Sequence, residues 1–120
     1  MAKLAATYEL VIASVLSVKR KDTNLTQKQF GARVGLSEFV VARMEQGHTG
    51  SLANLYIFTR GLQIQPWELF KEVDDLVNFM RRRDVAVVVK IPEGDDLVPM
   101  KRKVVESYAT IMKYEFRLPQ

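Results

Sequence analysis

Hydrophobic residues recur three or four positions apart within several segments between residues 4 and 80, the spacing that gathers side chains on one face of an α-helix. The first stripe predicts a helix that ends in the cationic triplet at residues 19–21, because positive charge suits a helix C-terminus. Asn24 follows the triplet, and asparagine tolerates the left-handed conformation that ends many helices. The members of the stripe are Leu4, Tyr8, Val11, Ile12, Val15 and Leu16.

Two short helices are predicted next, with almost no loop between them. Thr26 is the expected N-cap of a helix over Gln27–Val34, and Gln29 completes a capping box. A three-residue turn beginning with glycine follows, and Ser37 then caps a helix over Glu38–Gln46. This arrangement is typical of a helix-turn-helix, whose second helix lies in the DNA major groove.

The second helix of this motif should have one face toward the core and one toward solvent. Val41 and Met44 are expected to point inward, toward Phe30 and Val34. The outward face then carries Glu38, Phe39, Ala42 and Arg43.

Two further helices complete the helical part of the chain. Ser51 caps a predicted helix over Leu52–Leu62, and Pro66 marks the first position of a fifth helix. That helix is expected to continue through Lys71–Arg83. The apolar residues of both helices are predicted to supply core: Leu52, Leu55, Tyr56, Phe58, Leu62, Trp67, Leu69, Phe70, Val73, Leu76, Val77 and Met80.

The pattern changes after Asp84. Val85–Ile91 is rich in β-branched residues and precedes the turn sequence Pro92–Asp96, so we predict a strand there. Helical spacing predicts a last helix over Lys101–Glu115, with a returning strand over Thr110–Leu118 as the alternative. The Val85–Ile91 strand is apolar on both faces and needs cover on each. We expect part of that cover from a second copy of the chain, which makes this region a homodimer contact.

Composition limits the possible functions. The chain has 120 residues, 48% of them hydrophobic, enough for one module with an appended element. Cysteine is absent and His48 is the single histidine, which excludes disulfides, thiolate sites and multi-histidine metal sites. No nucleophile or phosphate loop accompanies His48, so we expect neither an enzyme nor a cofactor. Glu9 interrupts the apolar N-terminus, so we predict a cytoplasmic protein without a signal peptide or membrane contact.

The net charge of +4 belongs to the N-terminal half. Residues 1–64 hold eight basic residues and four acidic ones, whereas residues 65–120 hold ten of each. A basic module beside a neutral one is expected when the first meets a polyanion. The basic triplets at residues 81–83 and 101–103 could extend such a footprint, although acidic neighbours partly cancel their charge.

Several short motifs occur together at fixed spacing. Leu-Thr-Gln starts at residue 25, Gly-x-Ser at residue 35 and Met-Glu-x-Gly at residue 44, and the pattern continues through Ser51-Leu52, Leu55 and Trp67-Glu-Leu-Phe70. Over residues 8–70 the chain resembles the Xre/lambda-repressor-like helix-turn-helix family. The resemblance implies a five-helix domain that binds DNA as a dimer.

The resemblance also implies roles for individual residues. Gln27 and Lys28 would meet phosphate at the start of the second helix, and Ser37 would lie near the flanking phosphates. The base-reading positions of the third helix hold Glu38, Phe39, Val40 and Arg43. A second phosphate clamp would involve Asn54, His48 and Thr49.

Three of the base-reading positions have alternatives. Arg43 can donate two hydrogen bonds to guanine, or it can contact phosphate or solvent. Phe39 suits a thymine methyl group or a partner protein, unless the helix register shifts and buries it. Glu38 can accept from cytosine N4, or it is a charge favoured by the helix N-terminus.

Three further positions bear on packing within the family pattern. Arg20 and Glu45 match a structural ion pair that ties the first helix to the third. Gly31 stands where the family usually has alanine, so we expect similar packing. Gln63 stands where a left-handed glycine commonly ends the fourth helix, so either it bears a strain of roughly 1–2 kcal/mol or the turn is built differently.

The sequence thus predicts a mainly α protein. Residues 1–70 form a five-helix lambda-repressor-like DNA-binding domain, and residues 71–120 form a small α/β extension for dimerisation. The expected function is sequence-specific transcriptional regulation, as a repressor that binds a palindromic operator in double-stranded DNA as a dimer. One alternative is an antitoxin that masks a toxin partner and autoregulates its operon. Another is a helix-turn-helix used only for protein contact.

Overall fold

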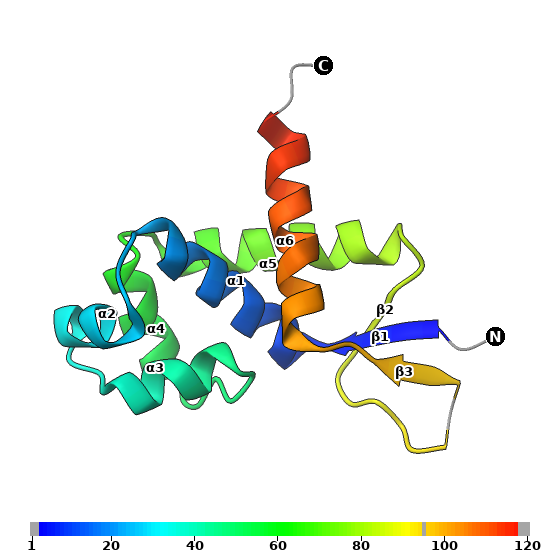
Figure 1. Ribbon diagram of the computed structural model, residues 1–120, viewed down its shortest axis with the longest axis horizontal. Coiled ribbons are helices and arrows are strands. Elements are labelled where there is room, and N and C mark those ends of the chain that lie inside the picture. The colour runs from blue at the N-terminus through cyan, green and yellow to red at the C-terminus, as the bar shows by residue number, and fades with distance from the viewer. Residues whose placement is uncertain (1–2, 95, 118–120) are drawn as a thin grey trace.

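The computed structural model describes residues 3–94 and 96–117, and within them the chain is mainly helical with a small three-stranded sheet. In chain order the elements are β1 (Lys3–Thr7), α1 (Tyr8–Asp22), α2 (Gln27–Val34), α3 (Glu38–Glu45), α4 (Leu52–Gly61), α5 (Pro66–Arg81), β2 (Ala86–Val88), β3 (Leu97–Pro99) and α6 (Arg102–Arg117). Figure 1 shows α2, α3 and α4 at one end of the molecule and the sheet at the other. Helices α1 and α5 run between the two ends, and α6 crosses them and projects from the body.

The first helix begins later than predicted, because residues from Leu4 onward form β1. Thr7 caps α1, and its hydroxyl accepts a hydrogen bond from the Leu10 amide at 3.1 Å. Strand β1 is the centre of a parallel sheet of order β2-β1-β3. Ala5 pairs with Ala86 on one side and with Pro99 on the other. A helical stripe cannot reveal this pairing, since the partner strands lie about 80 or more residues further along the chain.

The predicted strand over Val85–Ile91 is shorter than expected and is not alone. Only Ala86–Val88 forms β2, and Val89 is 82% exposed. The partner that the sequence left unidentified is β1, from the same chain. The expectation that this strand has no partner within the chain is therefore wrong, because β1 pairs with it along one edge, and β3 pairs with the other edge of β1.

The last element is a helix, as predicted, and not a returning strand. Helix α6 covers Arg102–Arg117, while Leu118 lies outside the described residues. One face of α6 packs against α1 and α5 through three buried side chains, Val105, Ala109 and Met112. Its first turns thereby join the core of the molecule.

The core differs from the predicted one at the start of α4 and α5. Val73, Leu76, Val77 and Met80 are buried as predicted, and so are Leu55, Phe58 and Leu69. Four residues predicted to be buried are exposed instead: Leu52, Tyr56, Trp67 and Phe70. Helical spacing identifies the apolar face of a helix, but whether a neighbour covers the whole face depends on the packing of the other helices.

The boundary predicted between residues 70 and 71 lies inside α5, which is continuous from Pro66 to Arg81. A single hydrophobic cluster contains residues from both sides of it, including Phe30 and Phe58 on one side and Val87 and Met112 on the other. The helical end and the sheet end therefore share one core.

Candidate nucleic-acid interface

Helices α2 and α3 and the turn between them have the caps that the sequence predicts. The Thr26 hydroxyl accepts from the Gln29 amide at 3.1 Å, and the Gln29 side chain accepts from the Thr26 amide at 3.0 Å. The Ser37 hydroxyl accepts from the Val40 amide at 3.1 Å. Gly35, with φ +81°, begins the turn in the left-handed region that glycine enters without strain. Local side chains thus fix where both helices start.

Gly31 has a role in this turn that the resemblance to the helix-turn-helix family did not suggest. A Cβ atom at this position would lie 2.3 Å from the Leu36 carbonyl oxygen, too close for any side chain. The expectation that alanine would pack equally well is therefore wrong for this chain. The turn passes directly over the backbone of α2, and only glycine leaves it room.

Helix α3 divides into the two predicted faces. Val41 and Met44 are buried, whereas Glu38 and Arg43 are exposed. Phe39 is 70% exposed, which rules out the alternative of burial through a shifted register. Val40 and Ala42 are half-buried at the edges of the outward face.

Phe39 and Arg43 also contact each other on that face. They are four residues apart on α3, and the Arg43 guanidinium carbon lies 5.7 Å from the centre of the Phe39 ring. At this distance the ring attracts the cation. The contact holds the guanidinium near the outer surface of α3.

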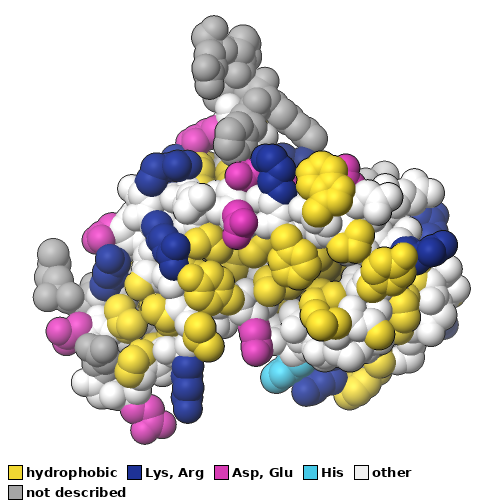
Figure 2. Space-filling model, turned by 180° about the vertical axis from the view of Figure 1, so that it is seen from behind, with side chains coloured by type: hydrophobic (Ala, Val, Ile, Leu, Met, Phe, Trp, Pro, Cys, Tyr) yellow, Lys and Arg dark blue, Asp and Glu magenta, His cyan; other side chains and the backbone are white. Residues whose placement is uncertain are grey.

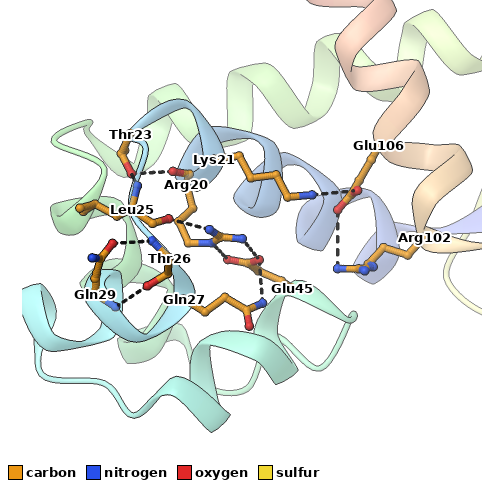
Figure 3. Close-up of polar contacts among 10 residues, drawn as sticks. All are labelled: Arg20, Lys21, Thr23, Leu25, Thr26, Gln27, Gln29, Glu45, Arg102 and Glu106. Atoms are coloured by element: carbon orange, nitrogen blue, oxygen red, sulfur yellow. Dashed lines mark hydrogen bonds and ion pairs between the residues drawn. The ribbon is translucent and has the colours of Figure 1, made fainter.

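A buried ion pair ties α1 to the end of α3 (Figure 3). Arg20 Nε donates to Glu45 Oε2 at 2.7 Å, and Arg20 Nη2 donates to Glu45 Oε1 at 3.0 Å. The Glu45 side chain is fully buried and that of Arg20 is 9% exposed. Arg20 also donates to the Leu25 carbonyl oxygen at 2.7 Å. The pair thus links α1, the loop before α2, and α3.

Gln27 belongs to the same cluster. Its Nε2 atom donates to Glu45 Oε1 at 3.2 Å, so its side chain points toward the ion pair (Figure 3). Lys28, next to it, is exposed and has no ion pair among the described residues. The Gln27 side chain is therefore engaged within the protein, which leaves its backbone amide for the predicted phosphate contact, and that contact stays a prediction.

The remaining predicted residues lie at the start of α4 and in the linker before it. Ser51 caps α4 by accepting from the Asn54 amide at 3.1 Å, and the Asn54 side chain is half-buried. His48 is exposed and Thr49 is half-buried between Gly47 and Gly50, which both have positive φ. None of these side chains forms an ion pair, and their predicted phosphate contacts stay predictions.

The cations of α2, α3 and α4 share one property. Among the described residues none of them forms an ion pair, and the only exposed carboxylate on these helices is Glu38, since Glu45 is buried with Arg20. These cations are Lys28, Arg33, Arg43 and Arg60. Arg33 was not among the predicted site residues, although a count of the basic residues in the motif would have included it.

Two other kinds of site were also sought. Within residues 3–94 and 96–117, no group of three or more histidine, aspartate or glutamate side chains could hold a metal ion. Over the same residues, no helix has the length and apolar character needed to cross a membrane. Comparison of the chain with protein-family models, with curated proteins and with solved structures found no match.

Proposed function

We propose that this protein is a sequence-specific DNA-binding transcriptional regulator, built on a lambda-repressor-like helix-turn-helix, and that it represses by occupying its operator. The observation that carries the proposal is the outward face of α3. That face exposes Phe39 and Arg43 instead of burying them, and the cations of α2, α3 and α4 around it have no ion-pair partner within residues 3–94 and 96–117. Unpaired positive charge around an exposed reading helix suits a polyanion with a readable groove.

Three side chains of α3 match the chemistry of base edges in the major groove. Arg43 can donate two hydrogen bonds to O6 and N7 of guanine. Phe39 offers an apolar surface for a thymine methyl group, and its contact with Arg43 suits neighbouring bases. Glu38 can accept from cytosine N4, which would give a carboxylate a role on a surface that faces phosphates.

Phosphate contacts would position α3. Lys28 and Arg33 are exposed on α2, and the amides at the first turn of α2 point out of its N-terminus. Ser37 is the N-cap of α3 and Asn54 lies in the first turn of α4, and both would contact the flanking phosphates. Such contacts fix the register of the protein on DNA without reading its sequence.

A homodimer would double the number of bases read on a palindromic operator. The C-terminal region stays our proposal for the contact, although its basis moves from the sheet to α6. The outer face of α6 exposes Val104, Ile111 and Tyr114, and the helix projects from the body (Figure 1). We expect Ile111→Asp to leave the melting temperature unchanged and to shift the solution mass from dimer to monomer. A dimer that persists in this variant would move the contact elsewhere.

The test of DNA binding is a selection of bound sequences from a random DNA library, followed by affinity measurements over a range of salt concentrations. We expect a two-fold symmetric consensus. With two exposed cations per chain at phosphates, Lys28 and Arg33, the slope of log K against log salt should be about −2 per chain. No enrichment of any sequence, together with no salt dependence, would refute the proposal and favour a helix-turn-helix used for protein contact.

A further inference from the structure

A groove lies between α4 and the first turns of α5, away from the outward face of α3. It has a volume of about 340 Å³ and walls that are almost entirely apolar. Leu55, Thr59 and Leu69 are the buried residues that line it, and Tyr56 and Phe70 are exposed at its rim. Figure 2 shows hydrophobic side chains gathered over α4 and α5 on this face of the molecule.

The exposed apolar surface includes Leu52 in the wall of the groove and extends beyond the groove to Trp67 of α5. Leu52, in the first turn of α4, is 81% exposed, and Trp67, in the first turn of α5, is 65% exposed. Contiguous apolar patches of this kind are uncommon on monomeric proteins unless they bind something. The patch is longer than the groove itself, so a small molecule seated in the groove would leave Trp67 uncovered. A polypeptide segment fits this extent better.

A positive charge at one end of the groove indicates which kind of polypeptide segment would bind there. Arg60 lines the polar hollow that shares Tyr56, Thr59 and Pro66 with the groove. Its guanidinium has no ion pair or hydrogen bond among the described residues. Arg33 lies beside Arg60 in the next hollow along the surface, so this end is cationic. Tryptophan, tyrosine and arginine are the residues that contribute most to protein interfaces.

We propose that the groove binds an amphipathic helical segment of a different protein. Apolar side chains three and four residues apart on that segment would enter the groove, as helices do in other apolar grooves. A carboxylate near one end of the segment would pair with Arg60. This interaction does not depend on the DNA-binding role proposed for α3.

The surfaces of this chain itself fit the groove less well. Helix α6 exposes Val104 and Ile111, but the unpaired charges beside them are Lys101 and Lys103, which have the same sign as Arg60. A second copy placed face to face would set one hollow against another and leave both unfilled. The complementary partner is therefore acidic and convex, which describes a single helix of another protein.

Trp67 makes the site directly measurable, because it is the single tryptophan of the chain. The probe is a synthetic helical peptide without tryptophan or tyrosine, with leucines at positions i, i+4 and i+7 and two glutamates after them. The control peptide replaces both glutamates with lysine. Titration of the full chain should shift the Trp67 emission to shorter wavelength and saturate, with the glutamate peptide at least about tenfold tighter than the lysine peptide. Arg60→Glu should reverse that preference.

Matched variants separate the groove from other surfaces. Phe70→Ala and Leu52→Ser should weaken the glutamate peptide by about tenfold or more, whereas Val89→Ser, at a side chain that is 82% exposed after β2, should have no effect. Melting curves confirm that each variant is folded. The proposal fails if the glutamate peptide gives no saturable shift, or if both peptides bind equally and Arg60→Glu does not reverse them. It also fails if Trp67 emission shifts with protein concentration alone and Phe70→Ala abolishes that shift, because a second copy would then occupy the groove.

Discussion

The two ends of the molecule carry their charges in different ways. At the helical end, which contains α2, α3 and α4, the cations Lys28, Arg33 and Arg43 have no acidic partner among the described residues. At the other end, part of the positive charge is neutralised: Arg83 pairs with Glu115, Arg102 with Glu106, and Lys3 with Asp84. The arrangement of charge, and not the number of basic residues, therefore distinguishes a surface suited to a polyanion from an ordinary solvated one.

The two ends also differ in where their stability arises. The sheet and α6 form few contacts of their own and depend on β1 and α1, which come from the start of the chain. The helical end contains a buried ion pair and two glycines, Gly31 and Gly61, against which other atoms pack too closely for a Cβ. Its geometry is held by a few specific contacts, so single substitutions should affect it strongly.

The largest expected effect is the loss of folding on truncation after Arg83. The truncated chain would lack β2, β3 and α6, which pair with β1 and cover α1. We expect no cooperative melting transition and no dispersed NMR spectrum. If residues 1–83 fold and melt cooperatively, the two ends are independent units and the shared core is not required.

The next largest effect should come from Glu45→Gln. The substitution leaves the Arg20 charge buried without its anion, which typically destabilises a protein by about 3–5 kcal/mol. Glu115→Gln at the other end is the matched control, because its partner Arg83 is solvent-exposed and such pairs contribute about 0–1 kcal/mol. Chemical denaturation of both variants measures the difference. Equal free energies of unfolding would mean that the Arg20–Glu45 pair has no special structural role.

A smaller effect is expected for Gly31→Ala. The added methyl group would collide with the Leu36 carbonyl oxygen, and overpacking of this kind costs about 1–3 kcal/mol. Gly94→Ala is the control, since no atom lies within 4 Å of a Cβ there and only its φ of +71° is unfavourable. That conformation costs roughly 1–2 kcal/mol for an L-residue. The two variants should also differ in DNA affinity, which only Gly31→Ala should reduce.

The features predicted correctly from the sequence depend on neighbours close in the chain. Thr26, Ser37 and Ser51 cap their helices because each side chain meets an amide three residues later. Gln63 adopts the left-handed conformation, with φ +60°, so the first of its two alternatives is correct. Both faces of α3 also followed from its spacing.

The features that were missed depend on distant parts of the chain. Strand β1 was predicted as part of a helix, because its apolar residues continue the helical spacing of α1. The strands that pair with it lie about 80 or more residues later, where local spacing cannot reveal them. Tyr56 and Trp67 looked buried, because spacing defines an apolar face without showing whether a neighbour covers it. The Gln27 side chain bonds to Glu45, which the sequence did not reveal. A glutamine side chain suits a phosphate contact equally well, so its residue type alone does not distinguish the two roles.

The most direct test of the account compares two substitutions on selected and on random DNA. Arg43→Ala should weaken binding to the selected operator by about 1–3 kcal/mol per half-site and relax the preference at one base position, with little change on random DNA. Lys28→Ala should weaken both DNAs alike and make the salt slope shallower by about 1 per chain. Equal losses on operator and random DNA for Arg43→Ala would show that Arg43 contacts phosphate, and would contradict the claim that the outward face of α3 reads the sequence.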